Sequence, residues 1–374
     1  MTQPIQFIDL QAQRRRLGAP LEQAILAAVQ GGQWIMGPQV AALEKQLAEF
    51  VGMKHCIACA NGTDALLIVL RAWDIGPGDA VFVPAFTFAA SAEVVALVGA
   101  TPVFVDVFED TYNIDPASLE AAIAMVKRDG KLKPKVVMPV DLFGQTADYR
   151  ALEPIVKREG LKMLCDAAQG FGALLDGRRA GGIGDAASTS FFPAKPLGCY
   201  GDGGATFTND DALNELLRSI RVHGQGSDKY ENVRIGVNSR LDTIQAAVLI
   251  EKMKLFPEEI ELRDAVAKRY NERLRASNRI VVPRVIDGAT STWAQYTIQV
   301  PDRDKVAAAL KAKGIPTAIY YPTPLSQQKG YSHFPSAPTP VSEKVSKTVL
   351  SLPMHPYLDE ATQDRIVEAV LDAV

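Results

Sequence analysis

The segment Ser188–Gly204, which reads STSFFPAKPLGCYGDGG, and the shorter segment Asp166–Gln169, which reads DAAQ, decide the expected fold and chemistry. Lys195 stands in a short loop between prolines, and Asp166 follows an apolar run. They are 29 residues apart, which leaves room for one strand with its connections, so both side chains can reach one site from adjacent strand ends. A lysine placed in this way can bind pyridoxal phosphate, whose pyridine nitrogen a carboxylate keeps protonated.

Each of these two residues also has a simpler interpretation. A lysine near Pro and Gly is usually a solvated cation, and an aspartate after a hydrophobic strand is often a helix cap. The glycine run Gly201–Gly204 and a separate phosphate motif favour the cofactor interpretation. Lys195 and Asp166 are therefore the candidate catalytic residues.

The phosphate motif is Asn61–Ala65, which reads NGTDA and lies between an expected strand, Cys56–Ala60, and an expected helix, Leu66–Ala72. Small residues at a helix start leave backbone N–H groups free, and the helix dipole favours an anion there. Gly62 and Thr63 are therefore candidates to bind the phosphate of the cofactor. An ordinary Asn-Gly turn with a threonine cap is the alternative.

Two further motifs do not predict sites. Gly182–Ala187 matches a dinucleotide-binding fingerprint, but it leads into a strand-like segment, whereas that motif must open a helix. Cys56 and Cys59 spell C-x-x-C, yet no second pair of ligands follows at a spacing suited to zinc. In a strand these two side chains would point to opposite faces. We expect no metal site, and reduced, mostly buried thiols at all four cysteines, which include Cys165 and Cys199.

The composition is that of a globular protein, with 47% hydrophobic and 22% charged residues among 374. A chain of this length usually exceeds one core, so we expect a cofactor-binding domain at 1–250 and a smaller one at 251–374. The net charge of −3 provides no cationic field for nucleic acid or an anionic membrane. The uncharged stretches are shorter than the roughly 18 to 20 apolar residues of a membrane span. The residues 1–10 lack a signal-peptide pattern, so we expect a cytoplasmic protein.

Strand and helix patterns alternate to about residue 210, which predicts an α/β fold with a mostly parallel sheet covered by helices. The expected strands are Ala80–Pro84, Pro102–Asp106, Lys135–Met138 and Leu161–Cys165. The expected helices between them are Ala89–Gly99, Pro116–Asp129 and Asp148–Gly160, with Asp115 as a cap. A charged helical tract, Ala246–Ala276, is broken near Pro257 and leads into the second domain, whose expected elements are Ile280–Pro283, Tyr296–Val300, Asp304–Lys313 and Asp359–Val374.

Over nearly its whole length the chain resembles the sugar-nucleotide aminotransferases of the DegT/DnrJ/StrS family. The segments that carry the resemblance are Gly32–Pro38, Asn61–Thr63, Pro84–Phe88, Asp166–Gln169, Ser190–Lys195, Gly201–Gly204 and Gly236–Asp242. The resemblance implies the aspartate aminotransferase fold, also called fold type I. It further implies a homodimer in which both subunits contribute to each active site.

The resemblance also implies individual contacts to the ring of the cofactor. Phe88 should stack on the pyridine ring, and Asp166 should pair with its nitrogen. Gln169 should lie near the phenolic oxygen. Phe88 has the alternative of an ordinary core residue, as aromatic residues in apolar strands usually are.

The phosphate contacts implied by the family come from two subunits. Gly62, Thr63 and Ser190 should bind the phosphate within one subunit, and Asn238 should reach it from the other. Ser190 has the alternative of satisfying a strand end, and Asn238 that of an ordinary turn residue.

Five residues are expected to bind the substrate, because they match family positions near the nucleotide-sugar pocket: Gly32, Trp34, Arg240, Tyr320 and Tyr321. The planar guanidinium of Arg240 can bind a carboxylate or phosphate through two hydrogen bonds. Packing at a domain junction is the alternative for the aromatic residues.

The implied reaction moves an amino group from glutamate to a keto sugar on a nucleotide, with Lys195 as the base. The branch of the family most similar to this chain aminates C3 of UDP-2-acetamido-2-deoxy-3-oxo-glucuronate for surface polysaccharide assembly. Ala194, Trp34 and Tyr320 depart from residues usual there. A C4 aminotransferase for a 4-keto-6-deoxy nucleotide sugar and a regulatory protein without enzymatic activity are the alternatives, and the retained lysine argues against the second.

Overall fold

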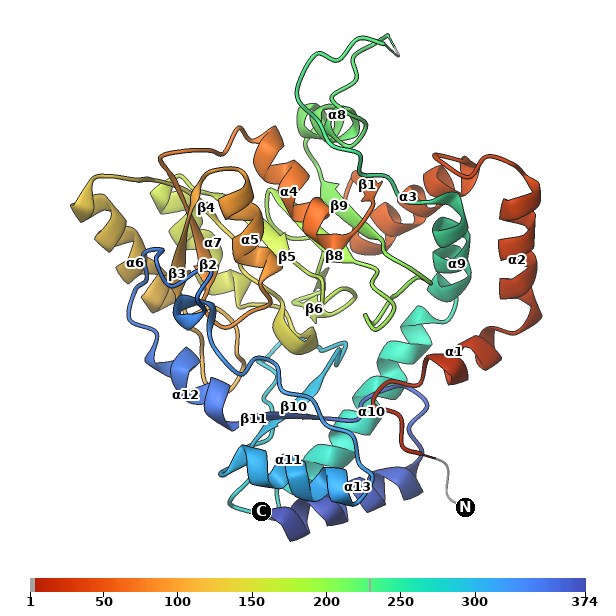
Figure 1. The fold of residues 1–374 in the computed structure, drawn as a ribbon, viewed down its shortest axis with the longest axis vertical. Helices are drawn as coiled ribbons and strands as arrows, with labels where there is room; N and C mark the ends of the chain where they lie inside the picture. The colour runs from red at the N-terminus through yellow and green to blue at the C-terminus, as the bar shows by residue number, and fades with distance from the viewer. Residues whose placement is uncertain (1–3, 229) are drawn as a thin grey trace.

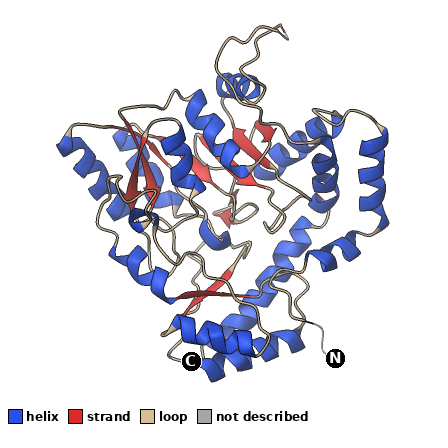
Figure 2. Cartoon of the chain, in the orientation of Figure 1, coloured by secondary structure: helices blue, strands red, loops and turns tan. Residues whose placement is uncertain are grey.

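The computed structural model describes residues 4–228 and 230–374, and its centre is a seven-stranded sheet (Figures 1 and 2). The strand order is β1-β9-β8-β5-β4-β2-β3, in which the strands from β8 to β3 are parallel and β9 is antiparallel to both neighbours. The strands are β1 (His55–Cys59), β2 (Asp79–Pro84), β3 (Thr101–Val105), β4 (Lys133–Val137), β5 (Lys162–Asp166), β8 (Ala186–Ser190) and β9 (Gly204–Thr208). The mostly parallel sheet expected from the sequence is confirmed.

Helices cover both faces of this sheet. One face packs against α4 (Gly62–Ala72), α5 (Ala90–Leu97) and α8 (Asp211–Ile220). The other face packs against α6 (Pro116–Asp129) and α7 (Tyr149–Glu159). Near β1 and β9 it packs against α3 (Pro38–Val51) and α9 (Thr243–Met253). The N-terminal helices α1 (Leu10–Leu17) and α2 (Ala19–Gln30) lie outside, where α2 contacts α9 (Figure 1).

Strand β2 shows how the sequence produces the three layers. Its side chains alternate between the faces, so Val81 and Val83 join the core under α4 and α5, whereas Ala80 and Phe82 join the core under α6 and α7. All four are fully buried, as expected for a central strand of a parallel sheet covered on both sides. The near-continuous apolar sequence of β2 therefore indicates a central strand that is buried on both faces.

The cysteines follow the same alternation. Cys56 belongs to the core on the α3 side of β1, and Cys59 belongs to the core on the α4 side. All four cysteines are free and buried, which confirms the prediction of buried thiols. Residues 4–228 and 230–374 contain no group of three His, Cys, Asp or Glu side chains placed to hold a metal ion.

The C-terminal part has its own core beside a two-stranded antiparallel sheet, which lies below the large sheet in Figure 1. Its elements are α10 (Phe256–Leu274), β10 (Tyr296–Gln299), α11 (Arg303–Ala312), α12 (Pro340–Thr348), β11 (Val349–Leu352) and α13 (Glu360–Ala373). The expected strand Ile280–Pro283 is reduced to one bridge between Val281 and Gln299. The helical tract breaks before Pro257, as expected.

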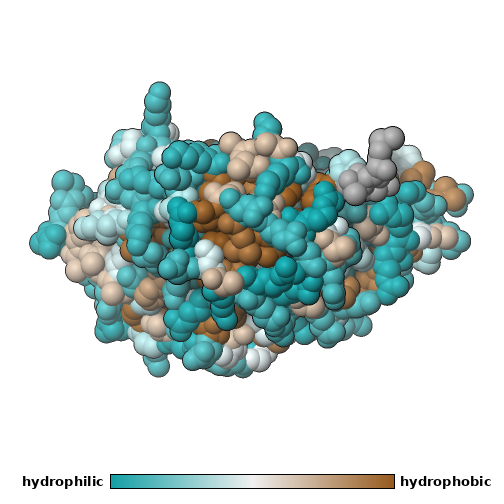
Figure 3. Space-filling view, turned by 90° about the horizontal axis from the view of Figure 1, so that it is seen from below, coloured by the Kyte–Doolittle hydropathy of each residue, from teal (hydrophilic) through white to brown (hydrophobic). Residues whose placement is uncertain are grey.

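The C-terminal part also returns to the large sheet. Leu325, in the short helix η2 (Leu325–Gln327), packs into the core under α4 and α5, and Ala337 packs into the core under α6 and α7. A domain boundary at residue 250 therefore stays a prediction. Seen from below, hydrophilic side chains surround a central group of hydrophobic ones (Figure 3). Among the described residues, no helix combines the length and apolar character needed to cross a membrane.

Candidate active site

The candidate catalytic residues lie at the carboxyl ends of two adjacent parallel strands. Asp166 is the last residue of β5, and β8, which carries Ser188 opposite Asp166, leads directly into the loop that holds Lys195. The carboxyl ends of parallel strands are where ligands bind in open α/β sheets. The formal dinucleotide motif Gly182–Ala187 leads into β8 and opens no helix, as expected from the sequence.

The carboxylate of Asp166 is buried but not isolated. Its Oδ2 accepts a hydrogen bond of 3.0 Å from the Ser91 hydroxyl, and its Oδ1 accepts one of 3.1 Å from the Ala168 backbone N–H. The Ser91 hydroxyl in turn lies 3.3 Å from that of Thr87. Burial raises the pKa of Asp166, while these hydrogen bonds and the charge of Lys195 oppose that rise. A cation close to this carboxylate would favour its charged form.

Lys195 stands on a short loop that is closed by backbone hydrogen bonds. Its N–H donates to the Phe192 carbonyl at 2.8 Å, and the Cys199 N–H donates to the Phe191 carbonyl at 2.8 Å. The side chain is half-buried, and burial lowers the pKa of its amine, whereas Asp166 favours the charged form. A lowered pKa increases the fraction of neutral amine, which is the form that can act as a nucleophile or base.

The predicted phosphate residues meet between α4 and the end of β8. A Cβ on Gly62 would lie 2.6 Å from the Cβ of Ser190, so only glycine fits there. The helix cap is Asn61, whose side chain accepts from the Asp64 N–H at 2.8 Å. The alternative of a threonine cap is therefore wrong, and Thr63 remains half-exposed in the first turn.

Aromatic side chains line one side of the site. The ring of Phe88 is 57% exposed, and its centroid lies 6.3 Å from that of Tyr321. The Tyr321 hydroxyl accepts a 3.1 Å hydrogen bond from Gln169, whose carbonyl oxygen accepts one of 2.8 Å from the Phe143 N–H. Phe88 therefore does not belong to the core, in contrast to the alternative considered from the sequence. Tyr320 is half-buried, with its ring centroid 5.9 Å from that of Tyr321.

The other expected substrate residues lie on two adjoining segments, which together are called the rim. Gly32 and the 56% exposed Trp34 lie in the loop between α2 and α3, whose Ile35 bridges Asp242. The segment before Asp242 carries Arg240, which is half-buried and has no carboxylate or hydrogen-bonding partner among the described residues. Asn238, in the same segment, is exposed.

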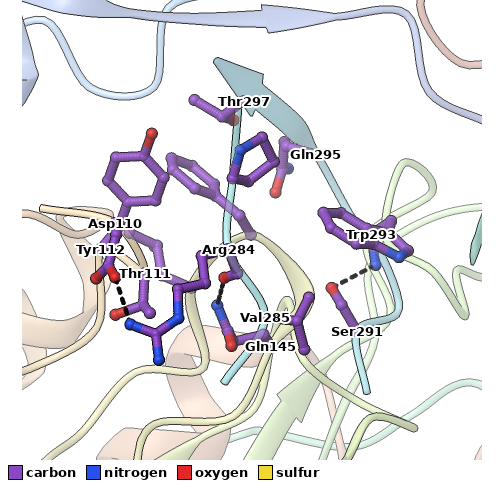
Figure 4. A pocket seen from close by; sticks show the side chains of 13 residues that line it. Asp110, Thr111, Tyr112, Gln145, Arg284, Val285, Ser291, Trp293, Gln295 and Thr297 are labelled. Atoms are coloured by element: carbon purple, nitrogen blue, oxygen red, sulfur yellow. Dashed lines mark hydrogen bonds and ion pairs between the residues drawn. The ribbon is translucent and has the colours of Figure 1, made fainter. Parts of the chain in front are cut away.

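A small cavity lies elsewhere, between the loops around Asp110 and Gln145 and the segment from Pro283 to Thr297 (Figure 4). Its volume is about 20 Å³, close to the space that one water molecule needs. An ion pair of 2.9 Å between Arg284 and Asp110 borders it. None of the expected site residues lines this cavity, so it is not the binding site for a cofactor or sugar.

Comparisons with known proteins identify the family of the chain. A model of the DegT/DnrJ/EryC1/StrS aminotransferase family matches residues 16–371. A Pseudomonas aeruginosa protein named UDP-2-acetamido-2-deoxy-3-oxo-D-glucuronate aminotransferase is 49% identical over 96% of this chain and 97% of its own. The crystal structure of a DegT/DnrJ/EryC1/StrS aminotransferase from Brucella abortus has a TM-score of 0.97 at 54% identity, over 98% of this chain and 99% of that one. A Bacillus subtilis protein solved with bound cofactor PMP has a TM-score of 0.90 at 28% identity, over 100% of this chain and 86% of that one.

The chain belongs to the DegT/DnrJ/EryC1/StrS aminotransferase family. It is an aminotransferase of fold type I that depends on pyridoxal phosphate. The family, fold class, enzyme class and cofactor expected from the sequence are confirmed.

The residues present fit pyridoxal phosphate. The open face of Phe88, the start of α4 beside Ser190 and the carboxylate of Asp166 offer a stacking surface, an anion site and a partner for the pyridine nitrogen. When bound, the cofactor supplies an electron-accepting ring that eases removal of the proton from the α-carbon of the amino donor. Lys195 would hold the cofactor covalently and then, once released, move that proton.

Sequence reasoning missed the polar support beneath the site. Ser91 and Thr87 were not singled out, although the first donates directly to Asp166. Ser91 is fully buried on α5, and a serine within an otherwise apolar helix face is the one signal that could have found it. The Phe143 backbone contact to Gln169 has no sequence signal, because it depends on a tight turn far along the chain.

Proposed function

We propose that this enzyme transfers the amino group of glutamate to C3 of UDP-2-acetamido-2-deoxy-3-oxo-glucuronate. The similarity to the Pseudomonas aeruginosa aminotransferase of that name supports this substrate. The observation that carries the proposal is Arg240, a half-buried cation without a carboxylate partner among the described residues. A glucuronate carries a carboxylate that a neutral 6-deoxy sugar lacks, and a desolvated anion needs a paired cation.

The polar groups of the site would hold the cofactor during both half reactions. Asp166, held by Ser91, fixes the pyridine end of the cofactor, and Gln169, held by the Phe143 backbone, fixes the phenolic side. In the first half reaction the amine of Lys195 would take the proton from the donor carbon and pass it to the cofactor, and in the second it would carry a proton from the cofactor to the acceptor carbon. Gly32 and Trp34, in the exposed loop between α2 and α3, would shape the sugar pocket together with the half-buried Tyr320.

The active enzyme is proposed to be a homodimer with shared sites. Large apolar side chains are exposed next to the rim: Trp34, Ile35, Met36, Val233 and Ile235, between 42% and 79%. Trp34, Ile35 and Met36 are consecutive in the loop between α2 and α3, and Val233 and Ile235 lie in the loop before Asn238. Exposed apolar side chains of this kind are typical of interaction surfaces. The exposed Asn238 lies beside this surface and would bind the phosphate in the neighbouring subunit. Surface polysaccharide assembly and a cytoplasmic location also stay predictions.

The test is to supply purified enzyme with glutamate and matched UDP-linked keto sugars, and to identify the amino sugar by mass spectrometry and NMR. The expected result is amination of the 3-oxo-glucuronate at C3, with slower turnover of its 3-oxo-glucose counterpart, which lacks only the carboxylate. Amination of a neutral 4-keto-6-deoxy sugar with no reaction of the 3-oxo-glucuronate would replace this proposal with the C4 alternative. No transamination with any sugar, despite a bound cofactor, would favour a regulatory protein.

A further inference from the structure

The loop that carries Lys195 is closed at its base by hydrogen bonds within the loop. The Cys199 N–H and thiol both donate to the Phe191 carbonyl, at 2.8 and 3.1 Å. Gly198 lies so close to the turn that a Cβ there would be 2.5 Å from the Pro193 carbonyl oxygen. The Gly198 carbonyl accepts a hydrogen bond from another element, outside the loop.

That element is α9, through a lysine buried inside the protein. Lys252 is 1% exposed, and its Nζ donates to the Gly198 carbonyl at 2.6 Å. The same Nζ lies 4.5 Å from the centre of the Tyr200 ring, within the range of a cation–π interaction. Burial lowers the pKa of Lys252 to about 8, while Glu259 and Cys199 favour its charged form. A buried lysine is costly, so its contacts with this loop need an explanation beyond packing.

A second residue of α9 binds the next part of the loop. The side-chain oxygen of Gln245 accepts a 2.8 Å hydrogen bond from the Tyr200 N–H. Its amide nitrogen would lie 2.9 Å from a Cβ on Gly201, so the glutamine also packs against the loop backbone. Gln245 and Lys252 stand seven positions apart in sequence, which places them on one face of the helix, two turns apart.

The start of α9 is attached to the substrate rim. The Thr243 N–H donates to the Trp34 carbonyl at 2.9 Å, and the Thr243 hydroxyl accepts from the Gly37 N–H at 3.0 Å. One helix therefore contacts both the loop of the catalytic lysine and the loop of the expected sugar pocket.

We propose that Lys252 and Gln245 are positioning residues of the aminotransferase, which hold the base of the loop and so fix the Lys195 amine relative to the Asp166 carboxylate. Neither touches the reacting atoms. A lysine suits the Gly198 contact because its long side chain reaches the loop from α9 and its charge strengthens the hydrogen bond to a carbonyl. The proposal rests on the cofactor chemistry of Lys195 and does not depend on which sugar is aminated.

The experiment compares Lys252→Met, which keeps the length and burial but removes the donor, with the matched surface variant Lys254→Met. Lys254 lies near the end of the same helix tract and is exposed, in an ion pair with Glu251. Hydrogen exchange of the Lys195 and Cys199 amides is measured in protein stripped of cofactor. Lys252→Met should speed exchange of both amides by about tenfold or more, the scale of a lost hydrogen bond to a charged group, whereas Lys254→Met should leave them unchanged.

The second measurement follows the return of the visible band when pyridoxal phosphate is added to the stripped protein. Lys252→Met should slow this covalent step by about tenfold, while cofactor-free thermal unfolding stays cooperative. Gln245→Leu should show the same pattern with a smaller effect, and it tests the proposal even if Lys252→Met does not fold. Equal exchange and equal recombination rates in Lys252→Met, Gln245→Leu and wild type would overturn the proposal. A lower unfolding temperature without either kinetic change would also overturn it, because it would show packing alone.

Discussion

The expected cofactor end of the sheet and the rim of expected substrate residues differ in how many partners a single chain supplies to their polar groups. At the cofactor end, both carboxylate oxygens of Asp166 have donors, and Gln169 is held through two hydrogen bonds. At the rim, Trp34 and Asn238 are exposed and Arg240 has no polar partner among the described residues. Partners within the chain preorganise catalysis, and open polar groups are suited to ligands and to a second subunit. The two regions should therefore respond differently to mutation.

The largest effect is expected at the cofactor end. Lys195→Ala should lower transamination by about a thousandfold or more, because both the covalent attachment and the base are lost. The wild-type protein should be yellow, and borohydride should label the Lys195 peptide and remove the visible band. Absorption spectra and peptide mass spectrometry check this, with Lys254→Ala as the control lysine. A wild-type protein that stays colourless with added pyridoxal phosphate would contradict the assignment.

The second effect separates the rim from the cofactor end. Arg240→Ala should cut turnover of the 3-oxo-glucuronate by more than tenfold, because the loss of a charge-assisted contact of this kind costs about 2 to 5 kcal/mol. The glutamate half reaction should be spared, since it does not involve the sugar carboxylate that Arg240 is proposed to pair with. Single-turnover kinetics of the two half reactions provide the measurement. An equal loss in both half reactions would place Arg240 in the cofactor machinery instead.

The two regions also differ in how much the sequence alone could predict. Lys195, Asp166 and Gly62 follow strand ends or begin a helix, and such local signals determine their place in an α/β fold. The sequence signal for Lys252 is weaker, because it is only a charged residue on the helix face that also carries Leu249 and is buried. The contact of Ser91 with Asp166 depends on how α5 packs on the sheet, which no local pattern encodes. The predicted partner for Asn238 lies in a second chain.

A third effect concerns the buried carboxyl of Asp141, beneath the cofactor end. Its Oδ1 accepts from the Ala147 N–H and the Tyr149 hydroxyl, at 2.9 and 2.7 Å, while its Oδ2 has no partner among the described residues. Burial raises the pKa of Asp141 to about 7, and the charge of Asp166 adds to that rise. Tyr149 also lies close to Cys165, and burial raises the pKa of that thiol.

This raised pKa has a defined consequence for stability. Between about pH 4 and pH 7 the folded protein binds the Asp141 proton and the unfolded chain does not, so stability falls as pH rises through that window. Asp141→Asn removes this dependence and can keep both hydrogen bonds to Oδ1. We expect the variant to gain stability relative to wild type from pH 5 to pH 8, by an amount on the order of 1 to 3 kcal/mol. Urea unfolding of the cofactor-free protein measures it, and parallel pH curves for the two proteins would refute the assignment.

The smallest effect should come from the rim residue assigned to the second subunit. If Asn238 donates to the phosphate across the interface, Asn238→Ala should weaken cofactor retention by about fivefold, the scale of one hydrogen bond to a charged group. Because the assembled state would bind the cofactor better than the monomer, added cofactor should also tighten the wild-type dimer, and this linkage should shrink in the variant. Sedimentation at a series of concentrations, with and without cofactor, measures both quantities. Asn278→Ala is the control, since that asparagine is exposed in the turn after α10. A dilute wild-type monomer that binds the cofactor as tightly as the dimer would mean that one chain completes the phosphate site, so that only the sugar rim would remain open to a partner.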